Sequence, residues 1–300
     1  MTAPHPSDGP GSRKLRLALI RKRVAILPTL CTLCNAACGL GALVFAARIN
    51  VAESFAPDVA MYISGWLIFV AMVFDLFDGF LARRTKTASS FGTELDSLCD
   101  AISFGAAPAF LLLQLGGSFE ERRIKEVFLL VATLYMVCVI LRLARFNTQT
   151  SLDAKSHRAF LGLPSPAAAG CIASLVVLHY NFNEFPRFAT DDVVNPIIRW
   201  FAPSGAMFLA LLMVSRVPYS HAANRILHRR FNFVRLVQVI LIVFALVLLR
   251  ELALVLMFWS YALYGPTRVL LGRLGFGAPP DSAASGESSA PPGQPTARTG

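Results

Sequence analysis

The sequence predicts an all-α protein of the membrane, a polytopic bundle of about eight transmembrane helices. Of its 300 residues, 55% are apolar and only 15% are charged, a composition too apolar for a soluble domain. Several stretches exceed the roughly 18–20 apolar residues that a helix needs to cross a bilayer. Basic clusters flank these stretches and bring the formal net charge to +10. Control of topology and contact with anionic lipid headgroups account for this charge, and a nucleic-acid partner is not expected.

The first 23 residues are polar and end in a basic cluster that the first apolar stretch follows at about 24–48. This stretch could be mistaken for a signal peptide. It is too long for an ordinary signal core, however, and it contains Pro28, Thr32 and Asn35, so we expect a helix that is retained. Seven further spans are predicted, at about 59–82, 91–115, 126–146, 159–180, 195–215, 233–249 and 252–271.

The connecting segments differ in charge. The segments 49–58 and 181–194 are mildly acidic. Under the positive-inside rule, the distribution of basic residues places both termini and the turn at Arg83–Lys86 in the cytoplasm. The last two spans are expected to form a hairpin at Arg250–Glu251. The basic segments are 11–23, 83–86, 142–158 and 216–235.

Three of the six cysteines, Cys31, Cys34 and Cys38, have a spacing that superficially suggests a metal site. No fourth ligand lies nearby, and the three positions trace one helix face. Small residues on one face let transmembrane helices approach closely, so we interpret these cysteines as packing residues. No disulfide framework is expected.

Four aspartates lie within the apolar sequence of the second and third spans. Asp75 and Asp78 are three residues apart, Asp96 and Asp100 are four apart, and a short basic turn separates the pairs. Residues at these spacings share a helix face, so two antiparallel helices would point all four carboxylates into one pocket. A rise of about 1.5 Å per residue places Asp75 roughly 12 Å inside the cytosolic end of its helix.

Ionised carboxylates at membrane depth are expensive, and four together repel one another unless a cation neutralises them. Hard oxygen ligands of this kind suit Mg²⁺ or Mn²⁺. Gly79 leaves backbone room beside the pocket, and Arg83 supplies positive charge where a phosphate group would enter. An ion-coupled transporter would also explain buried carboxylates, although it explains the adjoining basic turn less readily. The pattern therefore favours an enzyme with a divalent-metal site.

These residues resemble the signature of the CDP-alcohol phosphatidyltransferase family, whose eight fixed positions this chain matches within 26 residues. The resemblance implies a membrane enzyme that moves a phosphatidyl group from a CDP-linked lipid to an alcohol and releases CMP. It implies a metal centre held by all four aspartates, with Asp100 also as general base. It further implies CMP and pyrophosphate contacts at Gly79, Ala82, Arg83 and Gly92, and a homodimer.

The chain further resembles the branch of this family that uses CDP-diacylglycerol and L-serine. The stretches that carry this likeness include Leu95–Asp100, Ser103–Ala109, Arg142–Asn147 and Gly162–Pro166. Thr29 stands where Asn is usual in the family, and Cys99 stands where a smaller Ala is typical. Serine is a zwitterion, so its recognition calls for a cation and a polar acceptor. Candidate groups lie at the cytosolic end of the fourth span, at Arg142, Arg145 and Asn147; these arginines could equally be plain cytosolic anchors.

The predicted organisation is a basic cytosolic segment at 1–23 and a phosphatidyltransferase core of six helices at 24–220. A basic loop with a C-terminal transmembrane hairpin follows at 221–275, and a disordered tail at 276–300. The cytoplasmic membrane is the expected location, with the active site at its cytosolic face. The sequence leaves open an acceptor other than serine, such as glycerol 3-phosphate or inositol phosphate.

Overall fold

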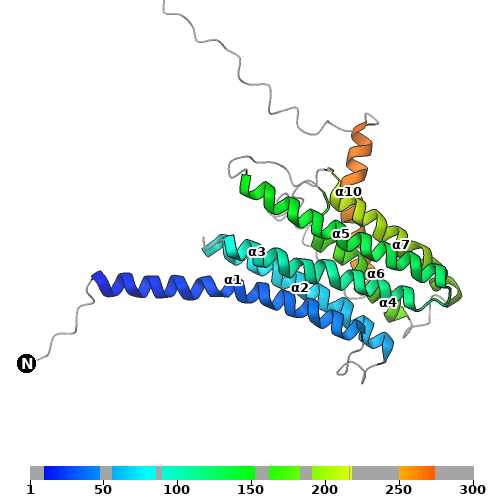
Figure 1. Cartoon of the computed structure of the whole chain (residues 1–300), viewed down its shortest axis with the longest axis horizontal. Helices are drawn as coiled ribbons and strands as arrows, with labels where there is room; N and C mark the ends of the chain where they lie inside the picture. Colours follow the sequence, from blue (N-terminus) through cyan, green and yellow to red (C-terminus); the bar gives the residue numbers. More distant parts are fainter. Residues whose placement is uncertain are drawn as a thin grey trace, which may run out of the picture.

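A computed structural model of the chain describes residues 10–47, 56–85, 90–152, 162–182, 191–215, 217 and 250–273. Within these ranges the protein is helical, as the sequence predicts (Figure 1). The elements are α1 (Pro10–Ala47), α2 (Pro57–Thr85), α3 (Ser90–Asp100), the π-helical segment η2 (Ala101–Ala106), α4 (Ala107–Gly117), α5 (Arg122–Leu152), α6 (Ser165–Phe182), α7 (Asp191–Val214) and α10 (Arg250–Arg273).

Six segments of the described chain are long and apolar enough to cross a membrane, which makes this an integral membrane protein. The predicted count of eight spans is not confirmed. The apolar part of α6, Ser165–Tyr180, is shorter than the other six segments and too short to be counted among them. The predicted span at 233–249 lies outside the described residues. The six are Leu27–Ala47, Pro57–Leu81, Phe91–Gly117, Arg122–Thr148, Pro196–Val214 and Glu251–Leu271.

The fifth predicted span begins later than expected, at Ser165 instead of 159. Pro164 directly precedes the helix, and Gly162 has a positive φ of 89°, a conformation that glycine adopts without strain. The Gly162 N–H donates to the Val217 carbonyl at 2.9 Å, and the Leu163 N–H donates to the Leu212 carbonyl at 3.2 Å. This connection therefore ties the start of α6 to the end of α7.

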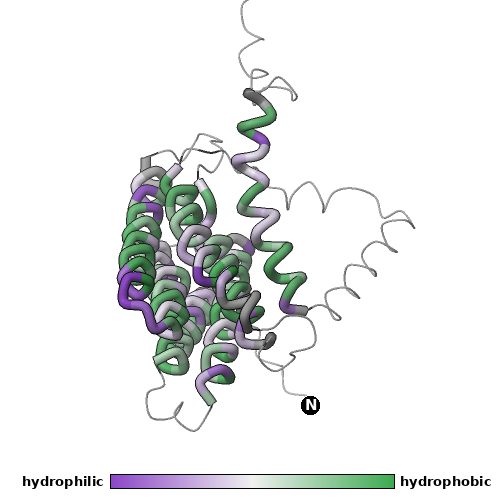
Figure 2. The backbone as a smooth tube through the Cα atoms, turned by 90° about the vertical axis from the view of Figure 1, so that its right-hand side faces the viewer, coloured by the Kyte–Doolittle hydropathy of each residue, from purple (hydrophilic) through white to green (hydrophobic). Residues whose placement is uncertain are grey.

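The bundle packs through small residues and a few large ones. α1 lies along α2, α2 also contacts α6, and α5 contacts α7. Tyr135 of α5 is fully buried, and its hydroxyl donates to the Phe104 carbonyl of η2 at 2.9 Å. Large apolar side chains such as Leu76 and Leu130 are exposed, as expected for a surface that lipid covers. Apolar residues extend along the helices of the bundle (Figure 2).

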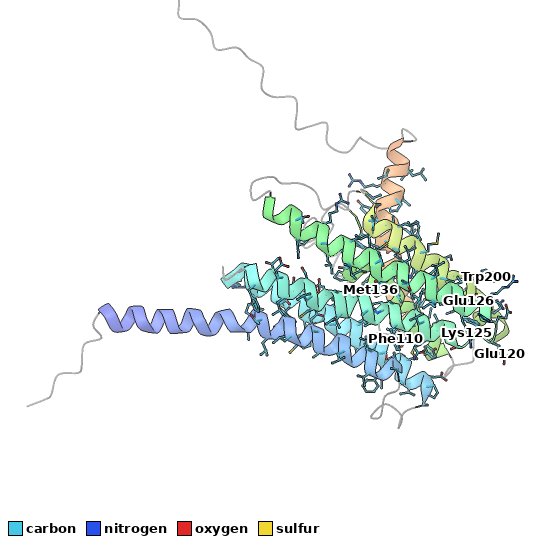
Figure 3. All side chains as sticks on the ribbon, in the orientation of Figure 1. Phe110, Glu120, Lys125, Glu126, Met136 and Trp200 are labelled. Carbon is cyan, nitrogen blue, oxygen red and sulfur yellow. The ribbon has the colours of Figure 1, made fainter. Side chains whose placement is uncertain are left out.

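Charged residues gather at the end of the bundle where α4 turns into α5. Glu120, Lys125 and Glu126 lie there near the exposed Trp200 of α7 (Figure 3). Trp at the border between the apolar span and a charged end is typical of a membrane interface. The start of α3 lies at the opposite end of the bundle (Figure 1). The aspartates on α2 and α3 lie toward that opposite end, where α2 ends and α3 begins.

Candidate functional site

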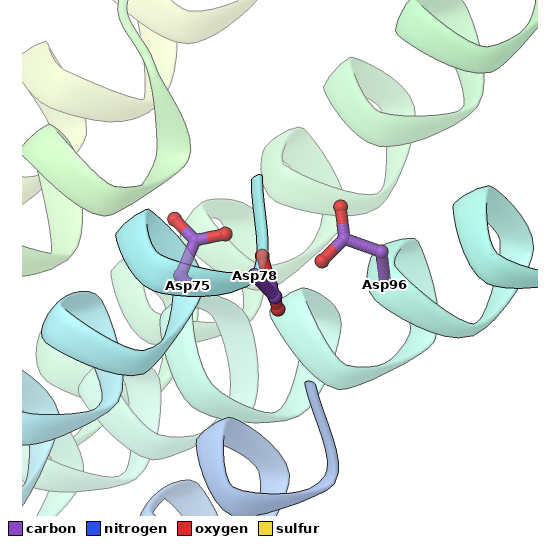
Figure 4. Close-up of side chains that lie close together, drawn as sticks. All are labelled: Asp75, Asp78 and Asp96. Carbon is purple, nitrogen blue, oxygen red and sulfur yellow. The ribbon is translucent and has the colours of Figure 1, made fainter. Parts of the chain in front are cut away.

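Three aspartates from two helices meet in one cluster. Asp75 and Asp78 share a face of α2 near its C-terminal end, and Asp96 comes from α3 (Figure 4). Each contributes one carboxylate oxygen to a group whose atoms all lie within 4.8 Å of one another. Asp78 is buried and the other two are half-buried. The spacing of three residues on α2 thus brings two of these carboxylates together, and α3 adds the third. The sequence predicts all four aspartates in one pocket, whereas the structure groups three of them.

The cluster fits a divalent cation. Oδ2 of Asp78 and Oδ1 of Asp96 are buried and have no hydrogen-bond partner among the described atoms. Buried acceptors without partners cost free energy, and neighbouring carboxylates repel one another. A Mg²⁺ or Mn²⁺ ion would relieve both effects, because each is a hard cation that prefers carboxylate oxygens. The three carboxylates are therefore donors that suit such a metal.

The fourth aspartate, Asp100, lies outside this group of three. It is 8% exposed and accepts a hydrogen bond from Nδ2 of Asn35 at 3.1 Å. Asn35 is fully buried on α1, and its backbone carbonyl accepts a hydrogen bond from the Ser103 hydroxyl at 2.9 Å. Asp100 is thus held from α1, one helical turn beyond Asp96.

A π-helical segment, η2, follows Asp100 immediately. Its wider turn is rare, and such turns occur frequently at functional sites. Here the turn presents Ser103 to α1 and packs Gly105 against α5, where an added Cβ would come within 2.9 Å of the Met136 sulfur. The segment therefore fixes Asp100 between two neighbouring helices.

A cavity of about 200 Å³ adjoins the cluster and brings α3, α5 and α6 together. Asp96 and Asp100 line it on the α3 side, and Arg142 lines it on the α5 side. One space is therefore bordered by the carboxylates and by a guanidinium. The other lining residues are Thr93, Ser97, Leu143, Phe146, Ser165 and Pro166.

Arg142 is the cation of this cavity. Its Nη1 donates to the Ser165 hydroxyl at 2.7 Å, and its buried Nε has no hydrogen-bond partner among the described atoms. The guanidinium also interacts electrostatically with Asp100 and, more weakly, with Asp75. A buried guanidinium with an unused N–H is suited to bind an anionic group.

The other two predicted serine contacts do not line this cavity. Arg145 reaches toward the end of α7, where its Nη1 is 3.5 Å from the Val214 carbonyl oxygen. Asn147 accepts a hydrogen bond from the Ser97 hydroxyl at 3.0 Å and donates to Glu94 at 3.4 Å. Asn147 therefore connects α5 to the first turns of α3.

The predicted nucleotide contacts lie along the same end of α2 and α3. Gly79 follows Asp78 on α2 and is half-buried, and Gly92 is half-buried near the start of α3. The side chains of Ala82 and Arg83 lie outside the described part of the structure, although both residues belong to α2. Gly79 and Gly92 thus adjoin the aspartate cluster in sequence on its two helices.

Two residues of the site are missing from the sequence-based prediction. Asn35 was noted only as a polar residue in an apolar span, although a buried amide at membrane depth is itself a signal of function. Ser165 belongs to the Gly162–Pro166 run, which carries the likeness to the serine-using branch but is not among the predicted site residues. Its contact with Arg142 joins α5 to α6, and no local pattern indicates it.

Comparison with known proteins identifies the family of the chain. The family model for CDP-alcohol phosphatidyltransferase matches residues 25–212. The CDP-diacylglycerol–serine O-phosphatidyltransferase of Methanocaldococcus jannaschii is 34% identical over 206 residues, which are 69% of this chain and 84% of that protein. The enzymes with this name from Helicobacter pylori and Bacillus subtilis are each 30% identical. The matches cover 72% and 69% of this chain, and 83% and 98% of those proteins.

The family match favours phosphatidyl transfer over the ion-coupled transporter that the carboxylates alone left open. It covers every element of the site, from Asn35 on α1 to Ser165 on α6. All four aspartates of the signature lie inside it, whereas α10 lies outside it. The chain belongs to the CDP-alcohol phosphatidyltransferase family.

Proposed function

We propose that the protein transfers the phosphatidyl group of CDP-diacylglycerol to L-serine and yields phosphatidylserine and CMP. The observation that carries this proposal is that Asp96 and Asp100 on one side and Arg142 on the other border the same cavity. The names of the relatives from three organisms support serine as the acceptor. The active site would face the cytosol at the cytoplasmic membrane, as the basic connecting segments indicate.

Asp75, Asp78 and Asp96 would hold the Mg²⁺ or Mn²⁺, since their oxygens converge within 4.8 Å. When bound there, the metal would neutralise the pyrophosphate and stabilise the departing CMP. The signature residues Gly79, Ala82, Arg83 and Gly92 would contact the nucleotide and its phosphates. These glycines lack side chains, so a phosphate group can approach the backbone closely.

Arg142 would bind the serine carboxylate. Its planar guanidinium can donate two parallel hydrogen bonds to a carboxylate, and its Nε donor is buried and unused. The cavity of about 200 Å³ is smaller than the roughly 300–1,000 Å³ of sites for drug-sized ligands. A small polar acceptor therefore suits it, while the lipid and nucleotide lie outside it.

Asp100 would accept the proton of the serine hydroxyl as the hydroxyl oxygen attacks the β-phosphorus of CDP-diacylglycerol. A bond forms between that oxygen and phosphorus, and the bond from phosphorus to the CMP oxygen breaks. The hydrogen bond from Asn35 would hold the carboxylate in place for this transfer. Because Asp100 lines the cavity with Arg142, the base and the carboxylate-binding group would orient the two ends of one serine.

The test is an assay of the purified full-length protein with CDP-diacylglycerol, labelled serine and Mn²⁺ or Mg²⁺. We expect equal amounts of phosphatidylserine and CMP, and loss of both products when EDTA removes the metal. Parallel reactions contain glycerol 3-phosphate or inositol phosphate in place of serine. Use of either one in preference to serine would contradict the acceptor while leaving phosphatidyl transfer intact. Turnover of serine that is unchanged by EDTA would contradict the proposed dependence on a metal ion.

A homodimer, which the family resemblance implies, would be checked by the mass of the detergent-solubilised protein.

A further inference from the structure

The Gly162–Pro166 run contributes part of the cavity wall at the start of α6. Ser165 and Pro166 of this run line the cavity together with Arg142. Ser165 is the first residue of α6 and is completely buried. Its hydroxyl oxygen accepts the 2.7 Å hydrogen bond from Nη1 of Arg142. The start of α6 therefore contacts the guanidinium that is proposed to bind the acceptor.

The Ser165 hydroxyl bonds to another helix although it lies at the start of its own. A serine at a helix start ordinarily accepts a hydrogen bond from a backbone N–H of the first turn. In α6 the Ala168 N–H donates to the Pro164 carbonyl at 3.1 Å, and Pro166 has no N–H to donate. The Ser165 oxygen instead accepts from Arg142 of α5. This bond therefore links two helices and is not an ordinary helix cap.

Backbone contacts with the end of α7 hold Ser165 in place. The N–H groups of Gly162 and Leu163 donate to carbonyls at that end, and the Leu163 side chain is completely buried. An added Cβ at Gly162 would come within 2.5 Å of the Met213 carbonyl oxygen, so the connection passes close to the backbone of α7. These contacts do not depend on a substrate. Ser165 is therefore positioned in advance, as a precise binding site requires.

We propose that Ser165 is a positioning residue for the acceptor: its hydroxyl holds Nη1 of Arg142 and so keeps Nε available for the acceptor carboxylate. This inference rests on the proposed role of Arg142. A guanidinium is planar and donates its N–H groups in fixed directions, so a bond to one nitrogen sets the directions of the others. The buried Nε has no hydrogen-bond partner among the described atoms, which leaves it for a carboxylate. Ser165 thus holds the arginine in an orientation that suits a carboxylate-bearing acceptor.

The experiment compares Ser165→Ala with the matched control Ser174→Ala in the full-length enzyme. Both serines are completely buried on α6, but the Ser174 hydroxyl donates to the Cys171 carbonyl of its own helix at 2.9 Å. For Ser165→Ala we expect the KM for serine to rise about 3- to 10-fold, with kcat and the KM for CDP-diacylglycerol changed by less than about 2-fold. Ser174→Ala should match the wild-type enzyme. An unchanged KM for serine, or an equal rise in both KM values, would overturn the proposal.

Ser165→Cys is a second variant that keeps the size of the side chain nearly constant. Its thiol is a weak hydrogen-bond acceptor, so the bond from Arg142 is weakened while the buried space stays filled. We expect the same selective rise in the KM for serine, and this variant decides the question if Ser165→Ala does not fold. A wild-type KM for serine in Ser165→Cys would then overturn the proposal.

A double-mutant cycle with Arg142→Gln separates an action through Arg142 from a general effect on packing. If Ser165 acts through the arginine, Ser165→Ala should raise the KM for serine by less than about 2-fold in an enzyme that already carries Arg142→Gln. Losses that multiply would contradict this route. The wild-type assay keeps the two proposals distinct, because failure to use serine at all refutes the proposed function. Normal serine turnover with an unchanged KM in Ser165→Ala refutes only the inference about Ser165.

Discussion

The α2–α3 half of the site and the α5–α6 half differ in both charge and origin. The first half holds Asp75, Asp78 and Asp96 on two helices that follow one another in the chain. Two of its buried oxygens have no hydrogen-bond partner in the described part of the structure. The second half holds Arg142 of α5 and Ser165 of α6, and it has a buried N–H without a hydrogen-bond partner among the described atoms. A cation would complete the first half and an anionic group the second. Under the proposed function, the first half would hold the metal and the second half the acceptor of one transfer reaction.

The largest effect is expected from neutralising the metal half. Asp78→Asn or Asp96→Asn should lower kcat by roughly 10³-fold or more, because each substitution removes a charged ligand from a cluster that acts as a unit. Phosphatidylserine formation at saturating substrates measures the loss.

Asp58→Asn is the matched control, since Asp58 is an exposed aspartate at the start of the same helix, α2. It should retain wild-type activity. Wild-type turnover by Asp78→Asn or Asp96→Asn would contradict a role of the aspartate cluster in catalysis.

The next largest effect should come from the acceptor half. Arg142→Gln keeps a hydrogen-bonding side chain but loses the charge, so we expect kcat/KM for serine to fall by about 10²-fold. The fall should lie mainly in KM for serine, because the metal half remains intact. Steady-state kinetics with serine varied at saturating CDP-diacylglycerol measure it. A loss confined to kcat would show that Arg142 does not bind the acceptor.

A smaller effect is expected at Asn35, whose amide donates a hydrogen bond to Asp100. Asn35→Ala removes the hydrogen bond to Asp100 and should lower kcat by about 10- to 100-fold, as is typical of groups that orient a reacting residue. Gln114→Ala is a suitable control, because Gln114 also bonds across to α1, at the Ala46 carbonyl, outside the described site. An equal loss of kcat in both variants would show that Asn35 contributes only to helix packing.

The metal half of the site and the fold class are the parts of the structure that the sequence predicts. The metal half is encoded within 26 residues, so helical spacing alone brings its carboxylates together. The fold class follows from apolar stretches that need only length and composition. The later start of α6 depends on Gly162 and its bonds to the end of α7, which no local pattern shows.

The acceptor half depends on contacts between helices that no short sequence pattern specifies. Arg142 and Arg145 are indistinguishable in sequence, because both are basic residues at the end of one span. In the assembled bundle Arg142 lines the cavity, whereas Arg145 lies further along α5 and reaches the end of α7. The π-helical turn after Asp100 and the bond from Asn35 likewise require the assembled bundle.

The smallest effects are therefore expected at Arg145 and Asn147. Arg145→Gln and Asn147→Ala should each change kcat/KM for serine by less than about 5-fold, because neither side chain lines the cavity. Asn147→Ala should instead lower the unfolding midpoint Tm slightly, since it removes bonds between α5 and α3. A KM effect as large as that of Arg142→Gln would place these residues in the acceptor site.

Mn²⁺-dependent stabilisation distinguishes the metal half of the site from the acceptor half. A ligand that binds the folded state raises Tm, so Tm would be measured with and without Mn²⁺ for the wild type, Asp78→Asn and Arg142→Gln. We predict that Arg142→Gln keeps the wild-type increase and that Asp78→Asn loses it. An increase that survives in Asp78→Asn and disappears in Arg142→Gln would contradict this division of the site.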